Sequence, residues 1–367
     1  MKKRVDAVYI HIPFCESICS YCDFPKVCYQ KKWIKQYLNS LEKEIKNNYK
    51  NELIKTVYIG GGTPSSLSID ELIKLFEIIS IFNIDENHEI TIECNIENTT
   101  KEKLEIMYKN GVNRLSFGVQ TFNQKHLNLL NRNHTYTDVK KIINLAKKIG
   151  FKNINMDLIY ALPNQTLDDL ALDIDLFLSL DINHISTYSL IIEDNTKIKI
   201  DKISNINDDL DYEMYNLIIN RLEKSGFNHY EISNFSKNNT ESKHNLTYWN
   251  NQEYYGFGMG ASGFVDNVRY TNTKNLSKYL NEMYIKEKEI MDYKTNLENA
   301  FILGLRKIKG INKNTFYQFY KKKINDILIV DKLIMEGKLI DDGENIYINK
   351  EYIYLSNDIL INFIGEV

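Results

Sequence analysis

The sequence is short of proline, of arginine, of long apolar runs and of excess charge of either sign. No stretch approaches the roughly 18 unbroken apolar residues that a membrane-spanning helix needs, and the amino terminus lacks the apolar core of a secretion signal. Lysine and arginine together number 46 against 49 acidic residues, and the net charge of −3 gives no electrostatic footprint for nucleic acid. We therefore expect a cytoplasmic protein with no transmembrane segment and no nucleic-acid partner.

The scarcity of arginine is informative because lysine is common in this chain. A planar guanidinium can pair with a carboxylate through two parallel hydrogen bonds, whereas the lysine ammonium acts as a point charge. An arginine here therefore indicates a position where lysine would not serve. Arginine occurs only at positions 4, 114, 132, 221, 269 and 306.

The first half of the chain alternates strand-like apolar runs with amphipathic helical stretches. Between the first two runs, Ile34, Leu38, Leu41 and Ile45 recur at helical spacing and predict a helix with one buried stripe. Six strand–helix units in a row predict an α/β fold with parallel strands and right-handed crossovers. Periodicity alone does not decide between a closed barrel and an open sheet. The candidate strands span 5–12, 54–59, 88–94, 113–119, 153–159 and 183–190.

The pattern changes after residue 200. A helix is predicted over 208–225, followed by a loop rich in Asn, Lys and Ser at 236–243 and by a glycine-rich segment, YYGFGMGASGF. Further on, short helices and a hairpin turning at Asp342-Gly343 favour a small helical or winged-helix-like unit. We divide the chain into a core over 1–235, a motif-bearing segment over 236–271 and a C-terminal domain over 272–367.

Residues that can bind ligands or take part in catalysis lie at or near the carboxyl ends of the predicted strands. The cysteine cluster follows the first strand and the sequence GGGTPS follows the second, while Glu93, Gln120 and Asp157 mark the next three. Because the carboxyl ends of parallel strands meet on one face of the fold, we expect these residues to share one cavity.

Three of the five cysteines lie on one loop, as Cys15-x3-Cys19-x2-Cys22. An odd number of cysteines argues against a secreted disulfide framework. Zinc remains an alternative, but structural zinc sites take four ligands, usually from two separated pairs, and Cys28 alone does not form a second pair. Three thiolates suit a [4Fe–4S] cube in which the protein holds three irons and the fourth stays open for a substrate.

This cysteine spacing, with Tyr21 before the last cysteine, resembles the signature of the radical S-adenosylmethionine (SAM) family. The resemblance implies a partial, open (β/α)6 TIM-like barrel with a smaller C-terminal domain. It also implies that SAM binds the open iron and, on reduction, yields methionine and a 5′-deoxyadenosyl radical. In such proteins the cofactors supply the difficult chemistry and the chain positions and shields them.

The same resemblance implies which residues surround SAM. A glycine-rich turn lets a polar ligand approach the backbone, a guanidinium can pair with the methionyl carboxylate, and carboxylates can accept hydrogen bonds from ribose hydroxyls. Taken alone, each acidic residue of the set could equally be a solvated loop acid. The implied set is Tyr9, Tyr21, Phe24, Gly61, Gly62, Thr63, Glu93, Gln120, Arg132 and Asp157.

Longer segments place the resemblance in one branch of the family. The segments YIHIPFCESICSYCDF, GGGTPSSL, RLSFGVQTF, NMDLIYALPNQT, HISTYSL and HNLTYW are similar to those of oxygen-independent coproporphyrinogen III oxidase and of HemW-type heme chaperones. The oxidase has another cysteine where this chain has Phe24, and a longer arm before its cluster. Relatives also often have glycine where this chain has Asn131 and Ala161.

The HNLTYW segment matches the H-N-x-x-Y-W motif of the chaperone branch. Imidazole and tyrosinate are both ligands of heme iron, and aromatic faces pack against porphyrins. The resemblance implies heme binding by His244, Tyr248 and Trp249 and delivery of heme to acceptor proteins of respiration, including delivery at the membrane surface. The nearby glycines are expected to let a flat ligand approach.

Two alternatives stay open at this point. His244, Tyr248 and Trp249 could serve only to dock their segment onto the barrel. The protein could also be an enzyme, either the coproporphyrinogen III oxidase or another radical SAM enzyme with a different substrate.

Overall fold

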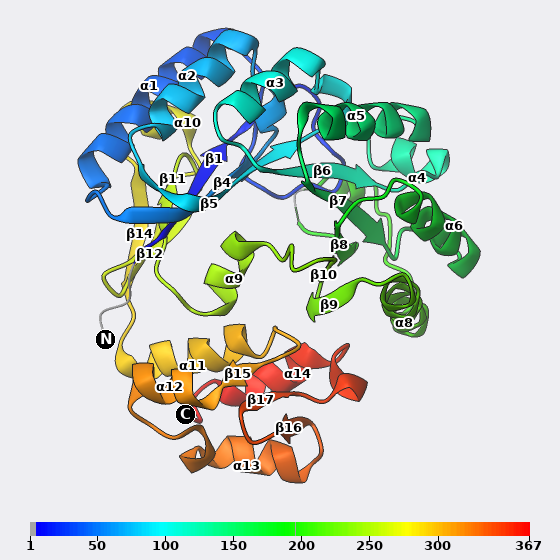
Figure 1. Ribbon diagram of the computed structural model, residues 1–367, viewed down its shortest axis with the longest axis vertical. Coiled ribbons are helices and arrows are strands. Elements are labelled where there is room, and N and C mark those ends of the chain that lie inside the picture. Colours follow the sequence, from blue (N-terminus) through cyan, green and yellow to red (C-terminus); the bar gives the residue numbers. More distant parts are fainter. Residues whose placement is uncertain (1–4, 195) are drawn as a thin grey trace.

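The computed structural model describes residues 5–194 and 196–367, so the charged residues 1–4 that precede the first strand, and residue 195, lie outside it. A 9-stranded sheet forms the centre of the molecule, with helices on its outer side and a smaller unit beside it (Figure 1). In spatial order the strands are β11 (Tyr255–Phe257), β1 (Ala7–Ile12), β4 (Leu53–Gly61), β5 (Asn83–Cys94), β6 (Arg114–Gln120), β7 (Asn153–Tyr160), β8 (His184–Ser189), β10 (Asn234–Ser236) and β9 (Asn228–Glu231).

The sheet is an open, partial barrel. Strands β11 through β8 of this order pair in parallel, and β10 and β9 then pair antiparallel at the far edge. Strands β11 and β9 stand at opposite ends of the order, so the sheet does not close on itself. All six predicted strands are confirmed, and the question of a closed or open sheet is settled in favour of the open form.

Helices connect the parallel strands and cover their outer side. The predicted stripe of Ile34, Leu38, Leu41 and Ile45 is buried on the first of these helices. Three of the helices begin with a capping box, in which Ser68, Thr135 or Thr166 bonds the third helical residue reciprocally. The connecting helices are α1 (Lys31–Asn48), α2 (Ile69–Ile79), α3 (Lys101–Lys109), α4 (Gln124–Leu129), α5 (Tyr136–Ile149) and α6 (Leu167–Leu178). After the last parallel strand, α7 (Lys197–Ile200) and α8 (Asp208–Lys224) lead to β9.

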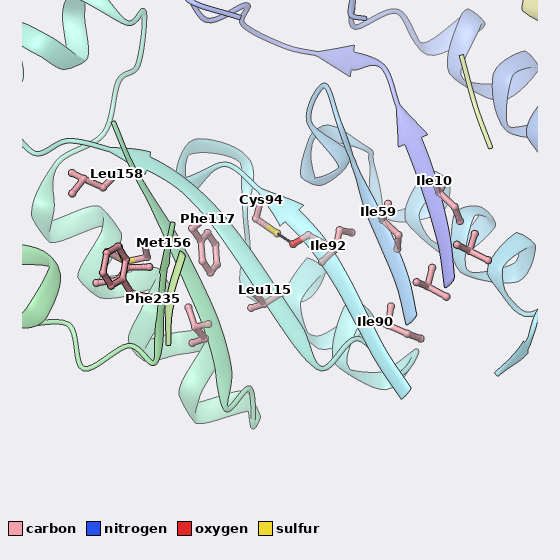
Figure 2. Packing of buried hydrophobic residues seen from close by; sticks show 14 of the residues in the cluster. Ile10, Ile59, Ile90, Ile92, Cys94, Leu115, Phe117, Met156, Leu158 and Phe235 are labelled. Atoms are coloured by element: carbon pink, nitrogen blue, oxygen red, sulfur yellow. Dashed lines mark hydrogen bonds between the residues drawn. The ribbon is translucent and has the colours of Figure 1, made fainter. Parts of the chain in front are cut away.

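The central strands present two chemically different faces. Apolar side chains that include Ile90 and Ile92 of β5, Leu115 and Phe117 of β6 and Met156 of β7 form one hydrophobic layer (Figure 2). The residues between them on the same strands are polar and line the opposite, concave side: Glu93, Arg114, Ser116, Asn155 and Asp157. The period of two along each strand therefore builds the core and the cavity wall from the same segments.

The segment after the sheet's far edge returns to its first strand. Helix α9 (Lys243–Trp249) lies on the concave side, and β11 then adds a parallel strand beside β1 (Figure 1). A 3-stranded antiparallel sheet follows, made of β12 (Ser262–Val265), β13 (Val268–Asn272) and β14 (Ile285–Ile290), with α10 (Leu276–Leu280) between the last two.

The C-terminal unit contains helices and a second 3-stranded sheet in the order β15-β17-β16. The predicted hairpin is confirmed, because Asp342 Oδ1 accepts hydrogen bonds from two backbone N–H groups at the turn and Gly343 takes a φ of 95°. None of the described helices is long and apolar enough to cross a membrane. The elements are α11 (Tyr293–Gly304), β15 (Ile311–Asn312), α12 (Lys313–Tyr320), α13 (Leu328–Met335), β16 (Leu339–Asp341), β17 (Asn345–Ile348) and α14 (Ser356–Leu360).

Candidate functional site

A cavity of about 800 Å³ lies on the concave side of the sheet. The three cysteines of the predicted cluster line it, and so does every predicted SAM residue except Tyr9. Its wall also includes Asn245 of α9 and residues of α8 and the C-terminal unit. The structure therefore brings together residues that are spread over most of the chain, as expected for the carboxyl ends of parallel strands.

The cysteine loop is held between two short strands, β2 (Phe14–Cys15) and β3 (Val27–Cys28), which pair in parallel. The Thr63 hydroxyl lies 3.5 Å from Cys15 Sγ, and Arg132 Nη1 lies 3.8 Å from Cys19 Sγ. Burial raises the pKa of the Cys15 thiol to about 11. Ligation of Cys15 as a thiolate therefore requires the positive charge of bound iron to lower that pKa.

The thiols do not form a site for a single metal ion. Over residues 5–194 and 196–367, no three His, Cys, Asp or Glu side chains are placed to chelate one ion. A [4Fe–4S] cube makes a different demand, because each cysteine binds a separate iron at its own corner.

The glycine turn after β4 packs tightly against the cluster loop and β5. Gly61 has a φ of +117°, which disfavours any side chain, and its N–H donates to Glu93 Oε2 at 2.9 Å. A Cβ on Gly62 would lie 2.7 Å from the Pro13 carbonyl and 3.0 Å from Cys15 Sγ. The glycines therefore keep the backbone close to the thiols, where a side chain would intrude.

Two half-buried carboxyl groups face the cavity. The Tyr58 hydroxyl donates to Glu93 Oε1 at 2.9 Å, and Asn155 Nδ2 donates to Asp157 Oδ1 at 2.7 Å. Burial is the main cause that raises the pKa of Glu93 to about 7 and that of Asp157 to about 6. A cationic ligand in the cavity would favour ionisation of both groups, so the pair suits a ligand that carries positive charge.

Gln120 and Arg132 leave buried polar atoms without partners beside the cavity. Gln120 has a φ of +73° and is 7% exposed. In the described part of the chain, neither Gln120 Oε1 nor Arg132 Nε has a hydrogen-bond partner. Buried polar atoms are nearly always paired in proteins, so these two atoms indicate a polar ligand.

Arg114 is a cavity residue that the motif analysis missed. It is 2% exposed, and no carboxylate among the described residues lies within ion-pairing distance of it. At longer range its charge lowers the pKa of both Glu93 and Asp157 against the larger effect of burial. Two signals in the sequence could have identified it. Arginine is rare in this chain, and Arg114 lies an even number of residues before Gln120 on the same strand, which predicts the same face of the sheet.

Two further SAM candidates, Tyr9 and Phe24, differ in their position relative to the cavity. Tyr9 lies behind the cavity wall, with its hydroxyl 3.0 Å from His11 Nδ1 and its ring stacked on Tyr58 at 6.2 Å. Tyr58 in turn bonds Glu93, so Tyr9 supports the site through Tyr58. Phe24 lines the cavity and is 62% exposed.

The predicted heme motif forms α9, which is docked on the sheet. His244 is 1% exposed, with Nδ1 2.9 Å from Thr56 Oγ1 and Nε2 2.7 Å from the Tyr248 hydroxyl. The buried Glu89 carboxylate accepts hydrogen bonds from the backbone N–H groups of Lys243 and His244 at 3.2 and 3.1 Å. Both ring nitrogens of His244 are therefore engaged within the protein.

Trp249 lies at the end of α9, away from the main cavity. The Arg306 guanidinium sits over its ring, 5.6 Å from the centroid, and its indole Nε1 has no partner in the described part of the chain. Trp249 also lines a separate cavity of about 320 Å³ against the C-terminal unit.

The expectation that the glycine-rich segment admits a flat ligand is wrong. A Cβ on Gly256 would lie 1.9 Å from the Ser262 carbonyl oxygen, and one on Gly258 would lie 2.5 Å from the His11 carbonyl oxygen. These glycines make room for the protein's own backbone at the β1–β11 edge of the sheet.

Comparison with known proteins agrees with this geometry. The sequence model of the Radical SAM superfamily matches residues 9–177. The heme chaperone HemW of Lactococcus lactis is 38% identical over 99% of this chain and 98% of its own length, and that of Bacillus subtilis is 38% identical over 98% and 100%. The structure of coproporphyrinogen III oxidase (HemN) from Escherichia coli is similar, with a TM-score of 0.87, 21% identity and coverage of 100% of this chain and 91% of that one.

The likeness to the oxidase shows the fold, since the identity between the two sequences is low. The likeness to the chaperones extends over nearly the whole of both sequences at higher identity. Membership of the superfamily implies a [4Fe–4S] cluster and SAM. The chain belongs to the radical SAM superfamily and, within it, to the family of the heme chaperone HemW.

Proposed function

We propose that this protein is a heme chaperone that carries a [4Fe–4S] cluster and exchangeable SAM, binds heme and delivers it to acceptor heme proteins. The acceptors include respiratory proteins met from the cytoplasm at the membrane surface. The observation that carries the proposal is one cavity whose wall includes the three thiols, the motif helix α9 and the C-terminal unit.

Three cysteines would hold the cluster: Cys15, Cys19 and Cys22. The fit rests on the thiol donor set and on the close glycine turn beside Cys15. When reduced, the bound cluster and SAM supply a 5′-deoxyadenosyl radical. The fourth iron, which has no cysteine in this assignment, is the place for SAM.

The orphaned polar atoms of Gln120 and Arg132 support a SAM site next to the cluster. Arg132 would pair with the methionyl carboxylate, and Glu93 and Asp157 would accept hydrogen bonds from the ribose or ammonium group. Their raised pKa values fit this role, because a cationic sulfonium compound favours their ionised forms. Tyr9, Tyr21, Phe24, Gly61, Gly62 and Thr63 complete the proposed surroundings.

For heme, His244, Tyr248 and Trp249 stay our candidates. Coordination of iron by His244 Nε2 requires its 2.7 Å contact with the Tyr248 hydroxyl to open. His244 would therefore bind heme iron only after α9 rearranges. Asn245, the next residue of the helix, already lines the cavity.

The test is transfer of heme from the purified protein to the apo form of a heme-dependent oxidase, with and without SAM and reductant. We expect stoichiometric heme binding and activation of the acceptor. The rival activity is decarboxylation of coproporphyrinogen III, assayed anaerobically on the reconstituted protein. Vinyl-bearing product at catalytic turnover, or an acceptor that stays inactive, would contradict the proposal.

A further inference from the structure

One end of the cavity is explained by neither the cluster nor SAM. This part of its wall is formed by α8, α9 and the C-terminal unit, which contribute Tyr215, Asn245, Arg306, Tyr354 and Asn357. The two tyrosine rings lie 5.8 Å apart and join α8 to the C-terminal unit. Aromatic surfaces next to amide and guanidinium groups suit a flat apolar ligand with an acidic edge.

Arg306 is the cationic group of this end of the cavity. The chain has few arginines, and three of them line this one cavity: Arg114, Arg132 and Arg306. Arg132 has an ion pair with Glu97 at 3.5 Å, and Arg114 lies among the carboxyl groups of the SAM site. Arg306 is the one of these three that belongs to the C-terminal unit rather than to the strands and loops that carry the residues proposed for SAM.

The surroundings of Arg306 leave its charge uncompensated. Among the described residues no carboxylate lies within ion-pairing distance, and Glu231 attracts it only from further away. Its Nη2 donates to Asn357 Oδ1 at 3.3 Å. A half-buried guanidinium with one neutral acceptor retains N–H donors for an anionic ligand.

We propose that Arg306 binds a propionate carboxylate of the heme carried in this end of the cavity. The assignment rests on the proposed function, since it takes a porphyrin as the ligand. A guanidinium is the side chain best suited to a carboxylate, because it can donate two parallel hydrogen bonds. Asn245 on α9 and Asn357 beside Arg306 supply amide groups at the same wall.

The proposal also gives Trp249 a role that its position alone does not explain. Trp249 lies beneath the Arg306 guanidinium rather than on the main cavity wall, and a cation over an indole face is attracted to it. The Arg306 carbonyl accepts from the backbone N–H of Ile232 at 3.1 Å, which fixes the main chain at this residue. Trp249 is thus a positioning residue that aims Arg306 from within the motif.

The experiment compares heme with heme dimethyl ester, in which both propionates are neutral. Absorption titrations use the anaerobically purified protein with its cluster and SAM, and both ligands are delivered in the same detergent. We expect Arg306→Gln to weaken heme binding about tenfold, the usual size for a lost charge-assisted hydrogen bond, and to leave ester binding unchanged. Arg306→Lys should recover part of the loss. Trp249→Phe should reduce heme binding in the same selective way, by about twofold to fivefold.

Arg221→Gln is the matched control, because Arg221 pairs with Asp175 outside the cavity and should bind both ligands as the wild type does. Cluster absorbance reports that each variant has folded. Wild-type affinity for heme in Arg306→Gln, or an equal loss for heme and ester, would overturn the assignment while leaving the proposed function standing. Absence of heme binding by the wild-type protein would overturn both.

Discussion

The part of the cavity proposed for SAM and the His244 end of α9 differ in how far their polar groups are satisfied. At the SAM end, Gln120 Oε1 and Arg132 Nε lack partners in the described part of the chain. On α9, both nitrogens of His244 and the first backbone N–H groups of the helix are bonded within the protein. The first region is therefore arranged for a ligand, whereas the second has to rearrange before His244 can bind one.

The largest expected effect concerns the cluster loop. Cys19→Ala should abolish retention of the cluster, because two thiolates cannot hold a cube that needs three. Iron and acid-labile sulfide are measured on anaerobically purified protein. The control is Cys28→Ala, since Cys28 is an exposed free thiol outside the cavity wall and its loss should leave the iron content unchanged. A full cluster in Cys19→Ala would refute the ligand assignment.

The second expectation is a pH dependence caused by Glu93. Burial raises its pKa from 4.5 to about 7, so between these values the folded apoprotein binds more protons than the unfolded chain. The free energy of unfolding should therefore fall as pH rises through this window and level off above it. In Glu93→Gln, the free energy of unfolding should fall over this pH window by about 3 kcal/mol less than in the wild type.

Denaturant unfolding of the apoprotein at pH 5 and pH 8 measures this dependence. Glu102→Gln, at an exposed glutamate on α3, serves as the control and should keep the wild-type profile. Identical pH profiles for the wild type and Glu93→Gln would show that Glu93 does not titrate as its burial requires.

A smaller effect is expected at the support of α9. Glu89→Ala should destabilise the fold by about 1–3 kcal/mol, because it leaves the buried N–H of His244 and the part-buried N–H of Lys243 unpaired. Glu86→Ala removes an exposed carboxylate from the same strand and should change little. Chemical denaturation compares the two variants. Equal stability of both would mean that α9 is not held by Glu89.

The smallest effect concerns backbone strain at Ala161. Ala161 has a φ of +57°, a left-handed conformation that penalises a Cβ. Ala161→Gly should stabilise the fold by about 0.5 kcal/mol, since relief of strain is partly offset by the greater entropy of the unfolded chain. Asn131 has the same φ of +57°, but asparagine tolerates it better and its Nδ2 donates to Ser17 and Ile18 of the cysteine loop, so Asn131→Gly should not stabilise the fold. Destabilisation by Ala161→Gly would contradict this explanation.

Much of the fold could be predicted because its signals are local. The alternating strands, the stripe on α1 and the turn at Asp342-Gly343 each depend on neighbouring residues. The openness of the sheet followed from the family resemblance and not from the periodicity, because it depends on β10 and β11 pairing with strands distant in sequence.

The candidate site divides in the same way. Cysteine spacing and the residues at the strand ends predicted one shared cavity, which the structure shows, since parallel topology brings those ends together. Arg114 has no motif of its own, and Glu89 and Thr56 show their contacts with α9 only in the tertiary structure. The role of the glycine-rich segment was predicted wrongly because its close neighbours are backbone atoms of β1 and β12.

The proposed function requires a cluster with one iron left open for SAM beside the orphaned atoms of Gln120 and Arg132. Electron paramagnetic resonance of the reduced protein, recorded with and without SAM, tests this directly. We expect the signal of a [4Fe–4S]+ cluster whose g values shift when SAM is added. A protein without the cluster signal, or a signal that SAM leaves unchanged, would contradict the account.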